Sequence, residues 1–177
     1  MMSPARPIAS RPGPERDASH KPAMTTSMSK ATPKRAVAAL LARAPDAQAL
    51  VMVPEINLTP QLQARFEARF GPSGVVALHS GMTNPQRLKS WVAAHLGTAR
   101  IVLGTRMAVL ASLPGLRLIV VDEEHDPSYK SQEGARYSAR DLAVLRVEHR
   151  GIPIVLGSAT PSLESYSNAV AGRYRLI

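Results

Sequence analysis

The chain has 177 residues, of which 22 are Lys or Arg and 13 are Asp or Glu, so its formal net charge is +9, and it has no cysteine. This length suits one domain with a tail and leaves no room for two large domains. The charge favours a polyanionic partner such as nucleic acid, and the lack of cysteine excludes a disulfide framework and a thiolate zinc site. No apolar run reaches membrane-spanning length and no secretory leader is recognisable, so we expect no membrane partner and a cytoplasmic location.

Residues 1–34 are rich in Pro, Arg, Ser and Thr, and their apolar residues show no periodicity. Such a segment buries too little apolar surface to offset the entropy lost on ordering. We therefore expect a disordered basic tail over residues 1–34 and a folded domain over residues 35–177.

From residue 35 onward, short apolar runs alternate with segments of helical periodicity. The runs that predict strands are 50–53, 75–78, 101–103, 116–121 and 154–156, and helices are predicted at 35–43, 60–70, 84–95 and 138–150, with a last one opening at Thr160 and Pro161. Fully apolar strands are typical of a parallel sheet with both faces covered. We predict an α/β fold with helices on both faces of a parallel sheet and ligands at the carboxyl ends of the strands.

The most apolar strand, 116–121, ends in the quartet Asp122-Glu123-Glu124-His125. A carboxylate at a strand end can hold Mg²⁺ in a phosphoryl-transfer site, and a neighbouring carboxylate can orient the attacking water. The alternative is a polar exit from a buried strand, with Asp122 capping the turn after it. The segment GSATPS, residues 157–162, comes after another apolar strand, so Ser158 and Thr160 should face the quartet. Thr160 is also a good helix cap before a proline, a role that leaves Ser158 unexplained.

The order of several segments resembles that of superfamily 2 helicases, and more narrowly that of the primosomal replication-restart helicases. The matching segments are VPEINLTPQ from Val53, HSGM from His79, GTR from Gly104, DEEHDPSYKSQEGARYSARD over 122–141, and GSATPSLES from Gly157. The resemblance covers about residues 35–177. It implies the first RecA-like, P-loop NTPase lobe of an ATP-dependent 3′–5′ DNA helicase, acting in DNA replication and in the restart of stalled forks. It also implies ATP and Mg²⁺ as cofactors, and DNA, primosome proteins and single-strand-binding proteins as partners. The zinc of the family is not expected here, because its cysteines are missing.

Carried over position by position, the resemblance assigns Asp122 to Mg²⁺ and Glu123 to the hydrolytic water. His125 is assigned to the coupling of hydrolysis to movement, opposite Ser158 and Thr160. Without the motif, a lone histidine after a strand is more often a structural hydrogen-bonding group.

Two further motifs imply contacts with the backbone of single-stranded DNA, and the residues that we expect to make them are Asn57, Thr59, Gly104, Thr105 and Arg106. Free amides at strand ends, a helix start and a guanidinium all suit phosphate oxygens. Outside its motif, Arg106 would be interpreted as a solvated surface charge.

The loop 126–137 brings together Tyr129, Lys130, Arg136 and Tyr137. Aromatic rings stack on bases while cations neutralise phosphates, and the resemblance implies a loop that senses DNA and signals to the ATP site. The alternative is a solvated loop with one tyrosine packed onto the core.

The glycine-rich loop GxxxxGK[ST], whose amides surround phosphates, is absent from the sequence. When Lys30 is aligned with the family lysine, Met24 and Ser29 replace glycines, Ala31 replaces the Mg²⁺-binding hydroxyl, and no apolar strand precedes the segment. We therefore expect an incomplete sheet of marginal stability, because the missing strand is central in the family.

The sequence also ends soon after GSATPSLES, without the second motor lobe of the family. We expect a truncated piece of a helicase with background ATP hydrolysis on its own. The alternatives are a non-catalytic single-stranded-DNA-binding module and the remnant of a disrupted gene.

Overall fold

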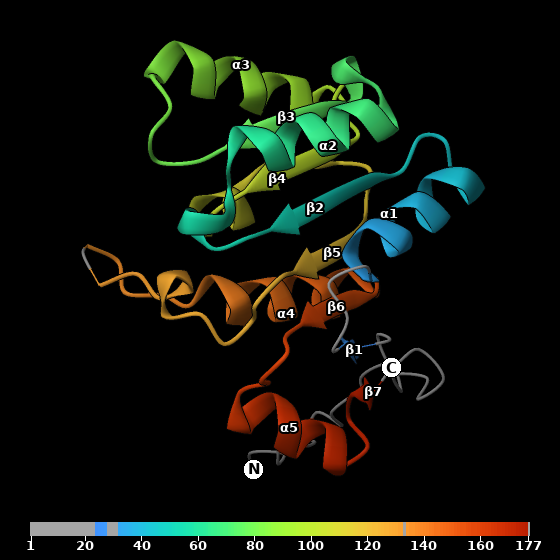
Figure 1. Cartoon of the computed structure of the whole chain (residues 1–177), viewed down its shortest axis with the longest axis vertical. Coiled ribbons are helices and arrows are strands. Elements are labelled where there is room, and N and C mark those ends of the chain that lie inside the picture. Colours follow the sequence, from blue (N-terminus) through green and yellow to red (C-terminus); the bar gives the residue numbers. More distant parts are fainter. Residues whose placement is uncertain (1–23, 28–31, 133, 177) are drawn as a thin grey trace, which may run out of the picture.

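The computed structural model describes residues 24–27, 32–132 and 134–176 (Figure 1). The strands are β1 (Met24–Ser27), β2 (Gln48–Met52), β3 (Val75–Leu78), β4 (Ile101–Gly104), β5 (Leu116–Val121), β6 (Ile154–Gly157) and β7 (Arg175–Leu176). The α-helices are α1 (Thr32–Arg43), α2 (Pro60–Phe70), α3 (Asn84–His95), α4 (Ala139–Arg150) and α5 (Leu163–Val170). Short 3-10 helices are η1 (Glu55–Asn57), η2 (Pro72–Gly74), η3 (Arg106–Leu110) and η4 (Pro127–Tyr129).

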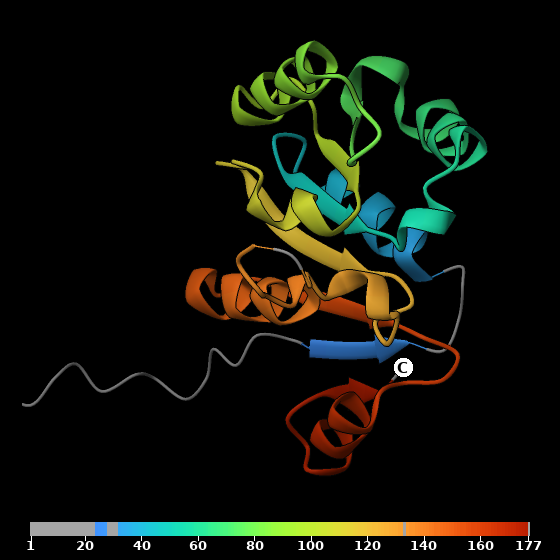
Figure 2. The same cartoon turned by 90° about the vertical axis from the view of Figure 1, so that its left-hand side faces the viewer.

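The strands form one sheet in the order β3-β4-β2-β5-β6-β1-β7, and every pairing in it is parallel. Figure 2 shows α4 on one side of this sheet and α1 and α2 on the other. The predicted α/β architecture, with a parallel sheet covered on both faces, is therefore confirmed. Each crossover between parallel strands carries a helix or a long loop, as such connections require.

Alternate residues of each strand enter two separate cores, because successive side chains of a strand point to opposite faces. In β2, Leu50 and Met52 pack with α4 residues such as Ala143, whereas Ala49 and Val51 pack with residues of α1 and α2. All five residues of β2 are buried. The apolar run of β2 thus marks a strand with no solvent-exposed face.

The predicted helix starts are confirmed at three positions. Thr59, Thr83 and Ser138 are the N-cap residues of α2, α3 and α4, and each hydroxyl accepts a hydrogen bond from a backbone N–H two or three residues into the helix. The last helix differs from the prediction. It begins at Leu163, and Ser162 rather than Thr160 is its N-cap. Ser162 is held in that place by the buried carboxylate of Glu124, which accepts a hydrogen bond from its amide.

The N-terminal part of the sheet also differs from the prediction. Residues 24–27, expected within a disordered tail, form β1 between β6 and β7, with Met24 paired to Ile154 and Ser27 to Gly157. The segment has one apolar residue, so hydrophobic periodicity gives no sign of it. Its backbone pairs on both sides, and this pairing satisfies amides that an edge would leave open. The expectation that the sheet lacks this strand is therefore wrong, and α1 begins at Thr32 rather than at residue 35. Residues 1–23 and 28–31 lie outside the described part of the chain.

Candidate functional site

The DEEH quartet and the GSATPS segment meet at the carboxyl edge of the sheet, as predicted. β5 and β6 are neighbours, and Val121 at the end of β5 pairs with Leu156 near the end of β6. The amide of Glu124 donates a hydrogen bond of 2.9 Å to the carbonyl of Gly157, so the two segments continue side by side beyond the strands. A side chain at Gly157 would approach Oδ1 of Asp122 to 3.3 Å. The glycine therefore leaves room for that carboxylate.

A backbone hydrogen bond and a constrained backbone conformation fix the positions of Asp122 and Glu123 at the end of β5. The amide of Asp122 donates to the carbonyl of Met52 at 2.9 Å. Glu123 has φ of +47°, the left-handed region, which costs a non-glycine residue about 1–2 kcal/mol. Backbone strain of this kind concentrates at functional sites. The turn presents both carboxylates at the end of β5.

His125 contacts Ser158, as the motif resemblance implies. Nδ1 of His125 lies 2.8 Å from Oγ of Ser158, and the same Oγ accepts a hydrogen bond of 3.0 Å from the amide of Thr160. Nδ1 is also 3.9 Å from Oε2 of Glu123. Ser158 is buried, whereas the side chain of Thr160 is exposed and takes no part in this contact. The histidine thus lies between Glu123 and the GSATPS segment.

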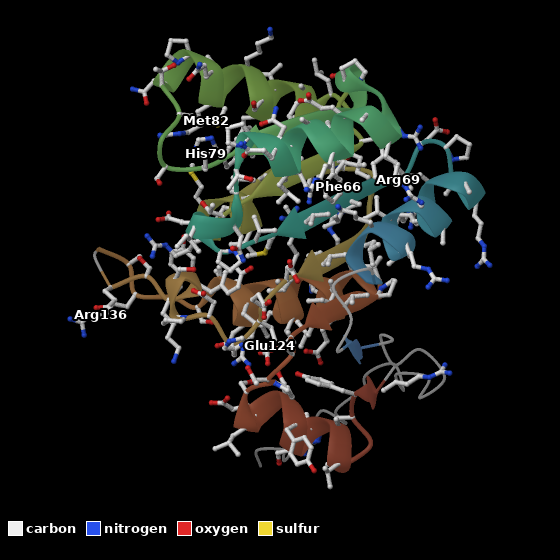
Figure 3. The ribbon with its side chains drawn as sticks, in the orientation of Figure 1. Phe66, Arg69, His79, Met82, Glu124 and Arg136 are labelled. Carbon is white, nitrogen blue, oxygen red and sulfur yellow. The ribbon has the colours of Figure 1, made fainter. Side chains whose placement is uncertain are left out.

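Glu124 is the residue that the sequence interpretation missed. Its side chain is fully buried and accepts hydrogen bonds from Ser162 N at 2.7 Å, Ser162 Oγ at 3.1 Å and Arg140 Nη1 at 3.1 Å. The same guanidinium reaches Oγ of Ser165 at 3.4 Å. One carboxylate therefore joins the end of β5, the start of α4 and the start of α5, and Figure 3 shows Glu124 between the sheet and α5.

The surroundings of Arg140 favour its charged form. Burial acts to lower the pKa of Arg140, but the adjacent carboxylate of Asp141 and the hydrogen bond to Glu124 outweigh it, so the pKa is raised. In the sequence the pair appears only as Arg140, 16 residues after Glu124, the last carboxylate of the DEEH quartet. Spacing alone does not indicate that the two side chains meet.

The loop after the quartet is anchored by a buried tyrosine. Tyr129 is 2% exposed, and its hydroxyl donates a 2.6 Å hydrogen bond to the carbonyl of Asp122. Burial raises the pKa of Tyr129 well above its ordinary value, and the nearby carboxylates, Asp122 first, raise it further. The prediction that Tyr129 stacks on a base does not fit this placement. The alternative, one tyrosine packed onto the core, describes it.

The cations predicted to contact DNA are exposed on the same loop. Lys130 and Arg136 are exposed, and Arg136 points away from the body of the molecule (Figure 3). Tyr137 is half-buried and packs on the core, while its carbonyl accepts from the amide of Ser131 at 2.7 Å. The two ends of the loop are thus held together, and the exposed residues described between them are Gln132, Gly134, Ala135 and Arg136.

Arg106 is tied to this loop. Its Nη1 donates to the carbonyl oxygens of Ser128 at 3.4 Å and Lys130 at 3.0 Å. Thr105, beside it, is 2% exposed, and its hydroxyl has no hydrogen-bond partner among the described residues. Gly104 has no room for a side chain, since a Cβ would lie 2.1 Å from Cβ of Ala108. Gly104 and Thr105 are buried, so the predicted DNA contacts of these two residues do not fit their placement, and only Arg106 of the GTR segment adjoins the surface of the loop.

A cleft of about 440 Å³ joins residues that were predicted to have separate roles. Asn57 and Thr59, expected at DNA, and Asp122 and Glu123, expected at a nucleotide, all line it. Thr59 uses its hydroxyl to cap α2 by accepting from the amide of Leu62 at 3.2 Å. Asn57 is exposed at the rim. Residues predicted to contact DNA and residues predicted to contact a nucleotide therefore lie around the same cleft.

Comparison with known proteins decides the family to which this geometry belongs. The family described as DEAD/DEAH box helicase matches residues 26–169, more than half of the chain. The chain belongs to this helicase family.

Its similarity to replication restart proteins is high but local. The helicase chain is 47% identical over 130 residues to replication restart protein PriA of Bacillus subtilis, covering 73% of this chain and 16% of that protein. It is 48% identical over 128 residues to PriA of Haemophilus influenzae, covering 72% and 17%. The chain therefore spans about a sixth of the length of these curated relatives.

Solved helicase structures share the RecA-like fold. The structure of RecG bound to a three-way DNA junction aligns with a TM-score of 0.57 at 20% identity, covering 88% of this chain and 20% of that one. The helicase MrfA bound to DNA and AMPPNP aligns with a TM-score of 0.59 at 16% identity, covering 88% and 24%. At these identities the likeness concerns the fold alone.

Membership of the helicase family implies the use of ATP and Mg²⁺, and the donor set fits them in part. Asp122 and Glu123 offer oxygen ligands, which Mg²⁺ prefers. The glycine-rich loop is the part that does not fit, because no glycine in the 177 residues is directly followed by a lysine. Ser29, Lys30 and Ala31, which align with that loop, lie outside the described residues.

No helix in the described part of the chain is long and apolar enough to cross a membrane.

Proposed function

We propose that this chain is the DNA-contacting part of the first motor lobe of a 3′–5′ replication-restart helicase. It binds single-stranded or forked DNA alongside primosome and single-strand-binding proteins. The observation that supports this most directly is the surface made by Arg106 and the loop after DEEH. There Arg106 fixes the backbone of a turn whose neighbouring side chains, Lys130 and Arg136, are exposed cations. Such cations neutralise backbone phosphates without reading sequence.

DNA binding is tested by fluorescence anisotropy of a labelled oligo(dT) at increasing salt. We expect the wild-type chain to bind at low salt, with an affinity that falls as salt rises. For each lost phosphate contact of Lys130→Ala and Arg136→Ala, the slope of log K against log salt should decrease by about 0.7. Lys89→Ala, on α3, is the matched loss of charge outside this surface. Absence of binding at low salt, or equal slopes for all variants, would contradict the proposal.

The second part of the proposal is that the chain alone hydrolyses ATP at background rate, with or without single-stranded DNA. Turnover in such motors depends on amides and a lysine that hold the phosphates in place, and the sequence lacks this loop. Phosphate release is measured for the wild type and for Glu123→Gln. DNA-stimulated turnover that Glu123→Gln abolishes would refute the expectation.

A non-catalytic single-stranded-DNA-binding module is the second candidate function. The missing glycine-rich loop favours it over a complete motor domain. The two candidates differ in one measurement, because only the motor fragment would regain turnover when a fragment carrying the glycine-rich loop and the second lobe of a relative is added in trans.

A further inference from the structure

The strand β3 forms an open edge of the sheet. It is the last strand in the sheet order, and it pairs with β4 alone. The carbonyl oxygen of Gly74, directly before β3, accepts a hydrogen bond of 2.9 Å from the amide of Arg100, directly before β4. Because successive residues of a strand direct their backbone groups to alternate sides, the amides and carbonyls of Val75 and Ala77 face away from β4. No described strand pairs with that side of β3, so its donors and acceptors are open to another chain.

A groove runs along this edge between two helices. α2 and α3 pack on opposite faces of the sheet, since Phe66 of α2 and Ala94 of α3 belong to separate cores, and Figure 2 shows the two helices on either side of the sheet. The groove has a volume of about 700 Å³ and is lined by residues 75–77 of β3, by Gln63 of α2 and by Ala93 of α3. A strand rises about 3.3 Å per residue, so β3 offers a length of about 13 Å to a segment laid beside it.

The ionisable side chains that line the groove are basic. They are His79 and Lys89, and no Asp or Glu is among the described lining residues. Lys89 is exposed, takes no part in the ion pairs within 4.0 Å of the described residues, and lies on α3, which contains no acidic residue. Glu67 accepts a hydrogen bond of 2.7 Å from Gln63 but does not itself line the groove. The groove therefore favours a ligand that carries carboxylates.

Two occupants from this chain do not suit the groove. The β3 strand of a second copy lies between its own α2 and α3, so these helices would meet before the two strands could pair. Residues 1–23 have the same sign of charge as the groove. Their charged residues, His aside, are Arg6, Arg11, Arg16, Lys21, Glu15 and Asp17. An extended segment of another protein has neither disadvantage, because it can enter as a single strand and bring acidic side chains.

We propose that the groove along β3 binds an extended, acidic peptide segment of a partner protein, which adds to the sheet as a further strand. The backbone groups of Val75 and Ala77 pair with those of the peptide, as in other complexes that extend a sheet edge. Lys89 pairs with a carboxylate of the peptide. Met82, half-buried at the carboxyl end of β3 beside His79 (Figure 3), contacts an apolar side chain. None of the residues that line the groove is among those proposed to contact DNA, so the inference goes beyond the proposed function.

The test is fluorescence anisotropy of the full chain with a labelled peptide of sequence TVEVEVT, capped at both ends to remove its terminal charges. We expect saturable binding, and none for the peptide TVKVKVT. A strand pairs with β3 along one of its edges only. N-methylation of one alternate set of peptide amides should therefore abolish binding, whereas N-methylation of the other set should be tolerated. A peptide held by charge alone would tolerate both.

Variants of the chain test the groove itself. Lys89→Glu should weaken peptide binding by about tenfold, because an attractive charge becomes a repulsive one. Arg35→Glu is the matched control, since Arg35 is exposed on α1 and does not line the groove. Ala93→Phe should fill the groove and abolish binding, with thermal unfolding as the check that the chain remains folded. Absence of peptide binding, equal affinity of Lys89→Glu and wild type, or equal tolerance of the two N-methylated peptides would overturn the proposal.

Nucleic acid is the other acidic partner, so oligo(dT) is added as a competitor. Peptide binding that persists with oligo(dT) present, and that is unchanged in Lys130→Ala and Arg136→Ala, would support a separate peptide groove. Displacement of the peptide by oligo(dT), with the same dependence on Lys89, would assign the groove to the DNA backbone and overturn the peptide assignment.

Discussion

Glu124 shows how one buried carboxylate can hold three segments together. Its side chain is fully buried, and it accepts hydrogen bonds from Arg140 and Ser162. A buried charge is tolerated only when it is paired and hydrogen-bonded, and removal of one partner leaves the other unsatisfied. The position of the segment that carries Ser158 and Ser162 therefore depends on Glu124, a residue for which the family resemblance implied no catalytic role.

Replacement of Glu124 by alanine is expected to lower the free energy of unfolding by about 3 kcal/mol, because it leaves the Arg140 guanidinium without its buried partner. Urea denaturation measures the change. Asp141→Asn is the control, since Asp141 pairs with the same guanidinium but its side chain is 56% exposed. Its loss should cost less than about 1 kcal/mol. Equal losses of unfolding free energy in Glu124→Ala and Asp141→Asn would contradict the expectation that burial of the carboxylate determines the cost of its removal.

The buried phenol of Tyr129 should make the folded chain less stable at alkaline pH. Its pKa is raised in the folded chain, chiefly by burial, so folding favours the neutral phenol. The stabilisation is complete below the ordinary pKa of about 10 and decreases above it, because only the unfolded chain then releases the proton. The free energy of unfolding should fall by about 1.4 kcal/mol for each pH unit above about 10 from this residue.

Urea unfolding between pH 8 and pH 11 tests this expectation. Tyr129→Phe should be less stable than wild type by about 1 kcal/mol near pH 8, since it loses a buried hydrogen bond, but its stability should fall less steeply above pH 10. Tyr166→Phe removes an exposed hydroxyl and should retain the wild-type slope. Parallel curves for wild type and Tyr129→Phe would show that burial of this phenol has no such effect.

At the scale of elements, the connection between β4 and η3 is set by the absence of a side chain at Gly104. A Cβ there would lie 2.1 Å from Cβ of Ala108 and 2.8 Å from the carbonyl oxygen of Leu78. The close approach brings η3, which begins at Arg106, against the end of the sheet. This is a packing requirement and not a conformational one.

Gly104→Ala is therefore expected to destabilise the chain by about 2 kcal/mol or more, the typical cost of overpacking. Gly74→Ala is the control, because a Cβ at that position meets nothing within 4 Å. Its effect should stay within about 0.5 kcal/mol. Thermal unfolding of the two variants compares them directly, and a tolerated Gly104→Ala would mean that η3 moves without cost.

Most elements were predictable because their signals are local. Apolar runs gave the strand positions, and segments of helical periodicity gave the helices. Gln48 is an exception. It is a polar residue inside β2, buried because its side-chain amide donates to the carbonyl oxygens of Ala94 and Ala99 and accepts from the amide of Gly115. Such partners come from distant parts of the chain, and no local pattern reveals them.

The candidate site was also predictable only in part. A parallel sheet brings strand ends to one edge, so the meeting of His125 and Ser158 followed from topology. The orientation of Tyr129 did not, because it depends on how the loop packs against the core. β1 was missed because its pairing with β6 involves the backbone, and backbone amides are the same in every sequence.

At the scale of the whole molecule, β1 covers the edge that β6 would otherwise expose. It fills the position between β6 and β7. A chain of residues 28–177 would lack it, and we expect this chain to aggregate or to unfold at lower temperature, because β6 then exposes an unpaired edge. A chain of residues 24–177 retains β1 and should behave like the full chain. Light scattering and thermal unfolding of both truncations give the comparison, and equal behaviour would contradict a stabilising role for β1.

The position of β1 also bears on how the protein is made. Met24 pairs with Ile154, about 130 residues later in the chain. At a synthesis rate of roughly 5–20 residues per second, β1 waits on the order of ten seconds for its first partner to leave the ribosome. During that time β2 to β5 can pair with one another, but the first strand cannot. The nascent chain therefore passes through a stage in which β1 has been synthesised but its partner β6 has not.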